Sequence, residues 1–149
     1  MGTDVFDVWL SAWNSNDGSI LAAAMIDDAV YVDVPWGRVL RPATIAEHVA
    51  LGYENSSDLS VEYVSTQREG EKYAFEWEMN GTNDGPIARG GLPASGRSWT
   101  IRGASIGTTE DGKIKVHREY WDLFGWLAQL GLTLPPQVHW VMTDWSEET

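Results

Sequence analysis

The spacing of apolar residues changes near residue 59, and this change constrains the fold more than any other feature of the sequence. Before it, apolar side chains recur at helical spacing, as in Phe6, Trp9 and Trp13. After it, polar and apolar residues alternate, which is the pattern of half-buried strands. Helices followed by strands are typical of the α+β class, in which helices pack on one face of an antiparallel sheet.

The first part of the chain predicts three helices. Each begins near a residue that can cap its first turn, and they are expected at 3–14, 17–25 and 44–54. Asp27 and Asp28 are expected to end the second helix. Thr44 and Glu47 fit a capping box, in which the two side chains satisfy each other's backbone N–H groups, so the third helix should begin there.

One short strand and four long strands are expected. The alternation Val-Tyr-Val-Asp-Val at 30–34 predicts the short strand, with Tyr31 and Asp33 on one face. The long strands are separated by turns that contain glycine, and they cover 59–66, 72–81, 98–108 and 113–121. Strands joined by short turns pair antiparallel. The longest loop is 83–96, and a short helix is expected at 123–130.

Composition excludes several classes of function. With 22 acidic and 10 basic residues the net charge is −12, and the basic residues form no patch, so neither nucleic acid nor an anionic membrane is an expected partner. The chain has no cysteine, which removes disulfides and thiolate chemistry. No apolar run reaches the roughly 18 residues of a membrane span, and no signal peptide is visible, so a cytoplasmic location is expected. A single domain over 1–149 is predicted, with 133–149 as a C-terminal tail.

Six short motifs follow one another in a fixed order along the chain. They lie at 12–17, 26–33, 81–86, 93–97, 110–114, and 120–123 with 129–132. As a set they resemble the SnoaL-like polyketide cyclases, which belong to the nuclear transport factor 2-like superfamily. Ketosteroid isomerases, limonene epoxide hydrolases and scytalone dehydratases share that fold, as do binding modules without chemistry. A shared fold therefore does not select a function.

The resemblance implies a cone. A strongly curved antiparallel sheet would wrap around about three N-terminal helices and enclose a deep, mostly apolar pocket. It also implies a homodimer, because the outer face of the sheet would otherwise expose Ile106, Val116 and Tyr120. The partner inside the pocket would be a small apolar molecule.

Strand alternation then predicts which side chains face the pocket. In the last strand, His117, Glu119 and Trp121 share one face. The other inward positions come from the earlier strands and are Tyr31, Asp33, Trp77, Met79, Trp99, Ile101 and Ser105. The result is an aromatic chamber with two carboxyl groups. An apolar chamber disfavours the charged carboxylate and raises its pKa, which suits general acid and base catalysis.

Three positions match the chemistry of relatives. Asp33 falls where ketosteroid isomerases carry the carboxylate that moves a proton beside a carbonyl. Glu119 falls where SnoaL-like cyclases carry their acid/base aspartate and where limonene epoxide hydrolases carry the aspartate that activates water. Tyr31 falls on the tyrosine that orients water in those hydrolases.

Other positions depart from every relative. Trp77 and Met79 stand where the hydrolases carry an arginine and a second aspartate. Trp9 and Ala104 replace the tyrosine and the second acid of the isomerases, and Ser105 replaces a histidine of the cyclases. No relative's site is therefore matched in full.

The same residues also have structural interpretations. Asp33 can bond a nearby turn amide. Glu119 can form an ion pair with His117, Arg102 or Arg118. A buried histidine such as His117 is more often a hydrogen-bonded interior residue than a catalyst.

No metal or organic cofactor is expected. Asp33, His117 and Glu119 can supply two carboxylates and one imidazole, but the sequence contains no His-x-x-x-His or Glu-x-x-His spacing. His48 and His139 show no distinguishing pattern. The glycine-rich loops of nucleotide-binding proteins are also missing from the sequence.

The sequence therefore predicts a cofactor-free enzyme that cyclises, isomerises or dehydrates a small, mostly apolar cyclic or polyketide-like substrate. Asp33 and Glu119 would be the general base and acid, Tyr31 an orienting donor and His117 a helper. The predicted substrate-binding residues are Trp9, Trp36, Trp77, Met79, Trp99, Ser105 and Trp121. An epoxide hydrolase that activates water and a non-catalytic module that binds apolar ligands are the alternatives.

Overall fold

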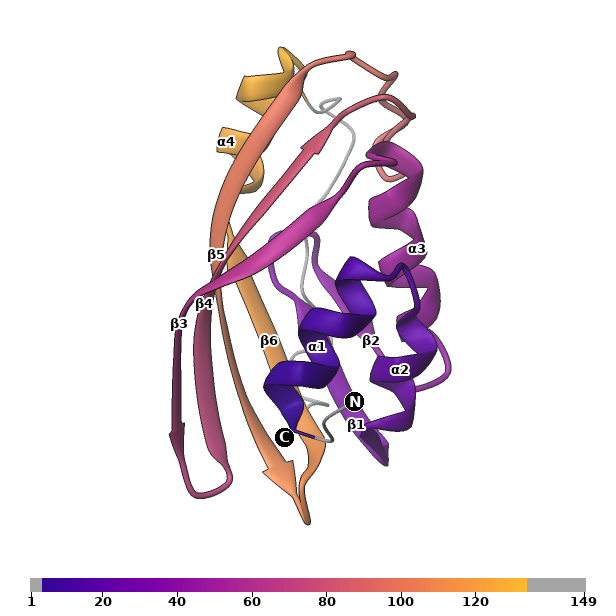
Figure 1. The fold of residues 1–149 in the computed structure, drawn as a ribbon. Helices are drawn as coiled ribbons and strands as arrows, with labels where there is room; N and C mark the ends of the chain where they lie inside the picture. Colours follow the sequence, from indigo (N-terminus) through magenta and orange to yellow (C-terminus); the bar gives the residue numbers. More distant parts are fainter. Residues whose placement is uncertain (1–3, 134–149) are drawn as a thin grey trace.

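Four helices lie against one six-stranded sheet in the computed structural model, which describes residues 4–133 (Figure 1). The predicted tail at 133–149 lies outside the described residues except for its first residue. In chain order the elements are α1 (Val5–Asn14), α2 (Gly18–Ala23), β1 (Met25–Asp33), β2 (Arg38–Leu40), α3 (Ile45–Asn55), β3 (Ser60–Glu69), β4 (Lys72–Thr82), β5 (Ser98–Glu110), β6 (Lys113–Trp121) and α4 (Leu123–Leu130).

The sheet is curved and does not close. Its strand order is β2-β1-β6-β5-β4-β3, and α1, α2 and α3 lie on the same side of it (Figure 1). The predicted antiparallel pairing is confirmed for every neighbouring pair except β1 and β6, which pair parallel. The chain leaves β2, crosses through α3 to the far edge of the sheet, and returns strand by strand. The last strand consequently reaches β1 in the same direction. The α+β cone expected from the sequence is the observed fold.

Strand β1 is longer than predicted. It begins at Met25 rather than residue 30, so Asp27 and Asp28 belong to the strand and do not end a helix. The pairing with β6 shifts register between Met25 and Val30. Both aspartates are solvent-exposed in this irregular stretch. Because a bulge lets polar side chains turn outward, two charges are tolerated within a strand.

The helix ends follow the sequence with one exception. The side chains of Asp4 and Asp17 accept hydrogen bonds from backbone N–H groups in the first turns of α1 and α2, as predicted. The capping box predicted at the start of α3 is wrong. Thr44 forms no side-chain cap bond there, because its hydroxyl bonds the backbone of Arg41 in the preceding turn. Such local side-chain bonds compete with helix capping.

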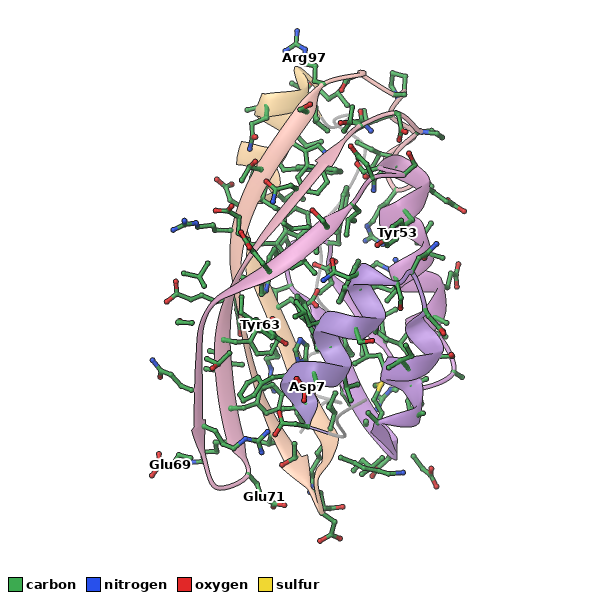
Figure 2. All side chains as sticks on the ribbon, in the orientation of Figure 1. Asp7, Tyr53, Tyr63, Glu69, Glu71 and Arg97 are labelled. Carbon is green, nitrogen blue, oxygen red and sulfur yellow. The ribbon has the colours of Figure 1, made fainter. Side chains whose placement is uncertain are left out.

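Aromatic side chains fill the space between the helices and the sheet (Figure 2). Trp9 of α1 is fully buried, and its ring centroid lies 4.8 Å from that of Phe75 on β4. Tyr63, labelled in Figure 2, reaches from β3 to α1 and donates its hydroxyl to the backbone oxygen of Phe6 at 2.5 Å. This packing leaves the upper part of the concave face, beside α3, for the pocket described next.

Candidate active site

A mostly apolar pocket opens between α3, the sheet and the loop that precedes β5. Its empty space amounts to about 800 Å³, part of which is open to solvent. Tryptophan dominates the wall, and the polar members are few. The lining residues are Trp9, Trp13, Asp33, Trp36, Arg38, His48, Leu51, Gly52, Asn55, Leu59, Trp77, Met79, Ile87, Ala88, Arg89, Trp99, Ile101, Glu119, Trp121 and Trp126.

Most of the side chains predicted to face the pocket do line it. Of the predicted substrate-binding residues only Ser105 does not, and its hydroxyl instead accepts a hydrogen bond of 3.1 Å from the indole nitrogen of Trp77. Tyr31 and His117 are also outside the lining. Both are fully buried and both contact Glu119, so they support the pocket from within the core.

The two carboxyl groups meet because of sheet register. Asp33 on β1 is the direct partner of Glu119 on β6, and Tyr31 is the partner of His117 two residues earlier. Directly opposite side chains on one face of a sheet lie side by side. Two acids 86 positions apart in the numbering therefore share one pocket wall, with 2% and 4% of their surfaces exposed.

Glu119 is surrounded by hydrogen-bond donors on one side. Its Oε1 accepts from the hydroxyl of Tyr31 and from Nε1 of Trp9 at 3.4 Å, and that indole also donates to Tyr31 at 2.9 Å. Burial raises the pKa of Glu119 to about 8, and the bond from Trp9 lowers it only in part. The carboxyl group therefore holds a proton at neutral pH.

Asp33 is held more firmly in its charged form. Its Oδ1 accepts from Nε1 of Trp121 at 3.0 Å. Burial raises the pKa of Asp33 to about 6, against the opposing effects of Trp121, the backbone N–H of Trp36, and the charges of Arg38 and Arg89. Asp33 is thus mostly ionised at pH 7, where Glu119 is not. Asp33 does accept a hydrogen bond from a turn amide, the backbone N–H of Trp36, as its structural interpretation suggested. It lines the pocket as well.

His48 is the site residue that sequence analysis missed. Its Nε2 lies 3.7 Å from Oδ2 of Asp33 and 3.7 Å from Oε2 of Glu119. Burial lowers the pKa of His48 to about 3, so the ring is neutral. Nη1 of Arg38 lies 3.4 Å from Nδ1, and because arginine only donates, Nδ1 accepts and Nε2 carries the proton. That N–H faces both carboxyl groups.

A signal for His48 does exist in the sequence. Within the predicted third helix, Ile45, His48 and Val49 occupy positions i, i+3 and i+4, which form one stripe along a helix. Ile45 and Val49 are fully buried. A histidine on the apolar stripe of a helix faces the core, so helical spacing alone placed it toward the sheet.

His117 has a different environment. Its Nδ1 is 2.8 Å from the hydroxyl of Tyr73, its Nε2 is 3.6 Å from Oε1 of Glu119, and the ring stacks on Tyr31 with centroids 4.3 Å apart. Burial lowers the pKa of His117 to about 3. A neutral ring in this position orients Tyr31 and Glu119 and does not reach the pocket.

Asp33, His48 and Glu119 are also the group within residues 4–133 that could hold a metal ion. One ligand atom from each lies within 4.8 Å of the others. The donor set suits a divalent cation. However, the proton placed on Nε2 of His48 by Arg38 occupies the nitrogen that faces the carboxylates, so metal binding requires that this tautomer be given up.

Burial of Glu119 should make the stability of the protein depend on pH. Its pKa of about 8 in the folded protein exceeds the ordinary 4.5, so above pH 6.5 the folded state binds more protons than the unfolded chain. His48 and His117 oppose this effect in part, because burial keeps them neutral in the folded protein, whereas at their ordinary pKa of 6.5 they are half protonated at pH 6.5 in the unfolded chain. The stabilisation from Glu119 is lost as the pH rises through 8, and after the opposing effect of the two histidines the free energy of unfolding should fall by about 1 kcal/mol between pH 6.5 and 8.5.

Urea denaturation at several pH values measures this loss. Glu119→Gln removes the group whose titration lowers the stability, so in this variant the free energy of unfolding should no longer fall over the same range. A fall that persists in this variant would mean that another group carries the effect.

The fold and the site together define a nuclear transport factor 2-like cone with an acidic pair in an aromatic pocket. The family model for SnoaL-like polyketide cyclases matches residues 3–130. The chain belongs to this family, and the resemblance inferred from its motifs is confirmed. No curated protein sequence matches the chain. None of the helices within residues 4–133 has the length and apolar character needed to cross a membrane.

Solved structures share the fold. A hypothetical protein with a ketosteroid isomerase-like fold from Catenulispora acidiphila, in complex with trimethylamine, is 20% identical, with a TM-score of 0.75 over 89% of this chain and 96% of that one. TsrD from Streptomyces laurentii is 26% identical, with a TM-score of 0.74 over 86% and 92%. An LEH-like epoxide hydrolase from M. tuberculosis is 18% identical, with a TM-score of 0.61 over 84% and 85%. The family supports an enzyme of the cyclase type in general, and the similar structures support the fold.

Proposed function

We propose that this protein is a cofactor-free acid–base enzyme that cyclises, isomerises or dehydrates a small, mostly apolar carbonyl compound of cyclic or polyketide-like structure. The observation that carries the proposal is the pairing of Asp33 with Glu119 across β1 and β6 inside the aromatic pocket. Their environments hold the pKa of Asp33 at about 6 and that of Glu119 at about 8. Two acids with separated pKa values are what a division into base and acid requires.

The proposal assigns the roles as follows. Ionised Asp33 removes a proton from a carbon beside the substrate carbonyl, and the electron pair moves to the carbonyl oxygen as an enolate. Neutral Glu119 delivers its proton to the enolate oxygen or to a departing hydroxyl group. Because Tyr31 and Trp9 both donate to Oε1 of Glu119, the acidic proton belongs on Oε2, the oxygen nearer His48. The Nε2–H of His48 supports the charged Asp33.

Exchange of hydrogen for deuterium tests this function without knowledge of the natural substrate. A panel of small cyclic ketones and 1,3-dicarbonyl compounds is incubated with the protein in D₂O and followed by NMR. We expect protein-dependent loss of the signal from hydrogens beside the carbonyl, in chelator-treated protein as well. Exchange that appears only after a divalent cation is added would instead make Asp33, His48 and Glu119 metal ligands. Tight ligand binding without exchange would favour a non-catalytic module.

Epoxide hydrolysis is a second candidate, favoured by the bond from Tyr31 to Glu119. In this reaction Glu119 would have to be ionised to activate water, whereas burial keeps its pKa at about 8. Trp77 and Met79 also occupy the wall where the hydrolases carry an arginine and a second aspartate. A diol product that takes up oxygen from H₂¹⁸O would establish hydrolysis and displace the cyclase-type proposal.

Two further proposals concern the oligomeric state and the cellular location of the protein. Homodimer formation through the outer sheet face is supported by exposed apolar residues there, Ile106 at 53%, Tyr120 at 41% and Val64 at 45%. Val116 was predicted to belong to the same patch, and it is less exposed than these three because it is half-buried. A cytoplasmic location stays a prediction from the sequence.

A further inference from the structure

Two tryptophans in the pocket wall differ from their neighbours in the state of the indole N–H group. This group only donates, so it either meets an acceptor or stays unsatisfied. Four pocket tryptophans donate to a protein side chain at 2.9 to 3.1 Å, and these pairs are Trp9 with Tyr31, Trp77 with Ser105, Trp99 with Ser56, and Trp121 with Asp33. Trp13 and Trp126 also line the pocket, but within residues 4–133 the Nε1 atom of each is buried without a hydrogen-bond partner.

A buried donor without an acceptor is costly, because folding removes its hydrogen bond to water and supplies no other. The side chains of Trp13 and Trp126 are 5% and 4% exposed. In the described part of the chain the one other side-chain atom in this state is Nε2 of His117, which lies 3.6 Å from Oε1 of Glu119 and outside the pocket lining. Unsatisfied groups of this kind are rare in folded proteins and have a physical reason. Because both indoles belong to the wall of one pocket, an acceptor on a bound molecule accounts for the two together.

Trp13 lies on α1, close to the acidic pair. Its ring stands perpendicular to that of His48 with centroids 5.6 Å apart, and Nε2 of His48 lies 3.7 Å from one oxygen each of Asp33 and Glu119. The benzene edge of Trp13 packs against Gly52 of α3, where an added Cβ would stand 3.0 Å from Cζ3. Nε1 belongs to the other edge of the indole, which is not held against α3.

Trp126 lies on α4, at the upper end of the sheet, whereas α1 lies lower down (Figure 1). It meets three pocket tryptophans nearly edge to face at centroid distances of 5.8 to 6.4 Å, and these are Trp36, Trp99 and Trp121. An aromatic face accepts an N–H only weakly, so these contacts do not replace an oxygen acceptor. Because Trp121 donates to Asp33, this end of the pocket also adjoins the acidic pair.

We propose that the N–H groups of Trp13 and Trp126 bind neutral oxygens of the substrate, so that the substrate is an apolar cyclic molecule with further carbonyl groups besides the one that reacts. Neutral oxygens fit a wall made mostly of tryptophan and aliphatic side chains, in which a charge would be costly. Because both nitrogens are buried, each ring turns slightly toward the pocket when the ligand binds, as side chains at binding sites commonly do. This inference rests on the proposed function for the identity of the pocket as a substrate site, and it adds the class of the substrate.

Two rigid probes that differ in one acceptor test the subsite. The ligands 2-adamantanone and 2-methyleneadamantane have nearly the same shape, and only the first carries an oxygen. The carbons beside its carbonyl are bridgeheads and cannot form an enolate, so 2-adamantanone reports binding without chemistry. Protein labelled with ¹⁵N in its indole groups is titrated with each probe and followed by NMR. We expect the N–H protons of Trp13 and Trp126 to move downfield with the ketone and not with the alkene.

Phenylalanine variants separate hydrogen bonding from packing, because phenylalanine keeps an aromatic ring and removes the N–H. Trp13→Phe and Trp126→Phe should each lower the ratio of ketone affinity to alkene affinity, and the double variant should lower it by about tenfold. Trp99→Phe is the matched control. Trp99 lines the same pocket, but its N–H is already bonded to Ser56, so this variant should change both affinities by the same factor. An unchanged ratio in the double variant, or indole protons that do not move with the ketone, would overturn the proposal.

Stability gives a second measurement, which needs no ligand. Removing an unsatisfied donor also removes its cost, whereas removing a bonded donor takes a partner from its acceptor. Trp13, Trp99 and Trp126 are buried to a similar degree, at 5%, 4% and 4% exposure. Trp13→Phe and Trp126→Phe should therefore lower the urea midpoint less than Trp99→Phe does. A larger loss in the first two variants would show that their N–H groups are satisfied in the folded protein, against the proposal.

The same measurements distinguish this inference from the proposed function. Deuterium exchange together with an affinity ratio that is unchanged in the double variant leaves the enzyme in place and removes the subsite. Movement of the two indole protons with the ketone, without exchange of any carbonyl compound, has the opposite meaning. A ketone preference that is lost in Glu119→Gln and kept in the double tryptophan variant would place the carbonyl at Glu119 and also remove the subsite.

Discussion

Replacing Glu119 by glutamine should lower the rate of deuterium exchange by about 100-fold to 10,000-fold, and Asp33→Asn should do the same. Both substitutions keep the shape of the side chain. A glutamine at position 119 can still accept a hydrogen bond from Tyr31, but it has no acidic proton to deliver. An asparagine at position 33 can still accept from Trp121, but it cannot take a proton from carbon. The loss therefore reports the chemistry and not the packing.

The two variants should differ in their pH dependence. The wild-type rate should be bell-shaped with a maximum near pH 7, because Asp33, with a pKa of about 6, must be ionised and Glu119, with a pKa of about 8, must be protonated. Asp33→Asn should remove the acidic limb from the residual rate, and Glu119→Gln the alkaline limb. The double variant should lose little more than either single one, since the pair acts as a unit.

Glu78→Gln is the control for the substitution itself. Glu78 lies on β4 in an exposed ion pair with Arg102, and its replacement should leave the exchange rate unchanged. Full activity in either Asp33→Asn or Glu119→Gln would end the acid–base proposal. His48→Gln should fall between the control and the two acids, because it removes a group that faces both carboxyls and accepts no proton from the substrate.

Local patterns in the sequence carried enough information to place the acids on the right face, but not to pair them. Alternation within a strand put Glu119 with His117 and Trp121, and Asp33 with Tyr31. The register that sets Asp33 beside Glu119 depends on a parallel pairing between strands far apart in the chain. No local signal encodes that register. Resemblance to a family supplied the expectation that the two strands share a pocket.

Other differences arise where tertiary contacts outweigh local preference. Asp27 and Asp28 were predicted to end a helix. They lie in β1 instead, because pairing with β6 extends the strand to Met25. The three-residue strand β2 is too short to show alternation, although it brings Arg38 to the pocket wall. The helical spacing of His48 predicts that it faces the core. It does not predict the contact with Asp33 and Glu119, because those residues belong to strands far away in the sequence.

Gly103→Ala should destabilise the protein by about 2 to 3 kcal/mol. The sign is unusual, because within a strand alanine is normally more stabilising than glycine by roughly 0.5 to 1 kcal/mol. Gly103 on β5 is the direct partner of Trp77 on β4, and the indole packs against it. A Cβ atom there would stand 2.3 Å from Cζ2 and 2.6 Å from Cη2 of Trp77. The ring is 2% exposed and its Nε1 donates a hydrogen bond to Ser105, so a shift away from the new Cβ would disturb packed neighbours and this bond. Urea denaturation measures the loss.

A double-mutant cycle isolates the clash. Trp77→Leu removes the six-membered ring that the new Cβ would meet, at a cost of its own from the space it leaves. In that background Gly103→Ala should be neutral or mildly stabilising, so the two substitutions should be coupled by about 2 kcal/mol or more. If Gly103→Ala costs the same with and without the indole, then glycine is required by the strand itself. Because Trp77 also lines the pocket, the single variant should bind an apolar aromatic probe, such as 2-naphthamide, more weakly in calorimetry. A glycine on β5, paired with Trp121 on β6, would then help to set the width of the chamber in which the two acids act.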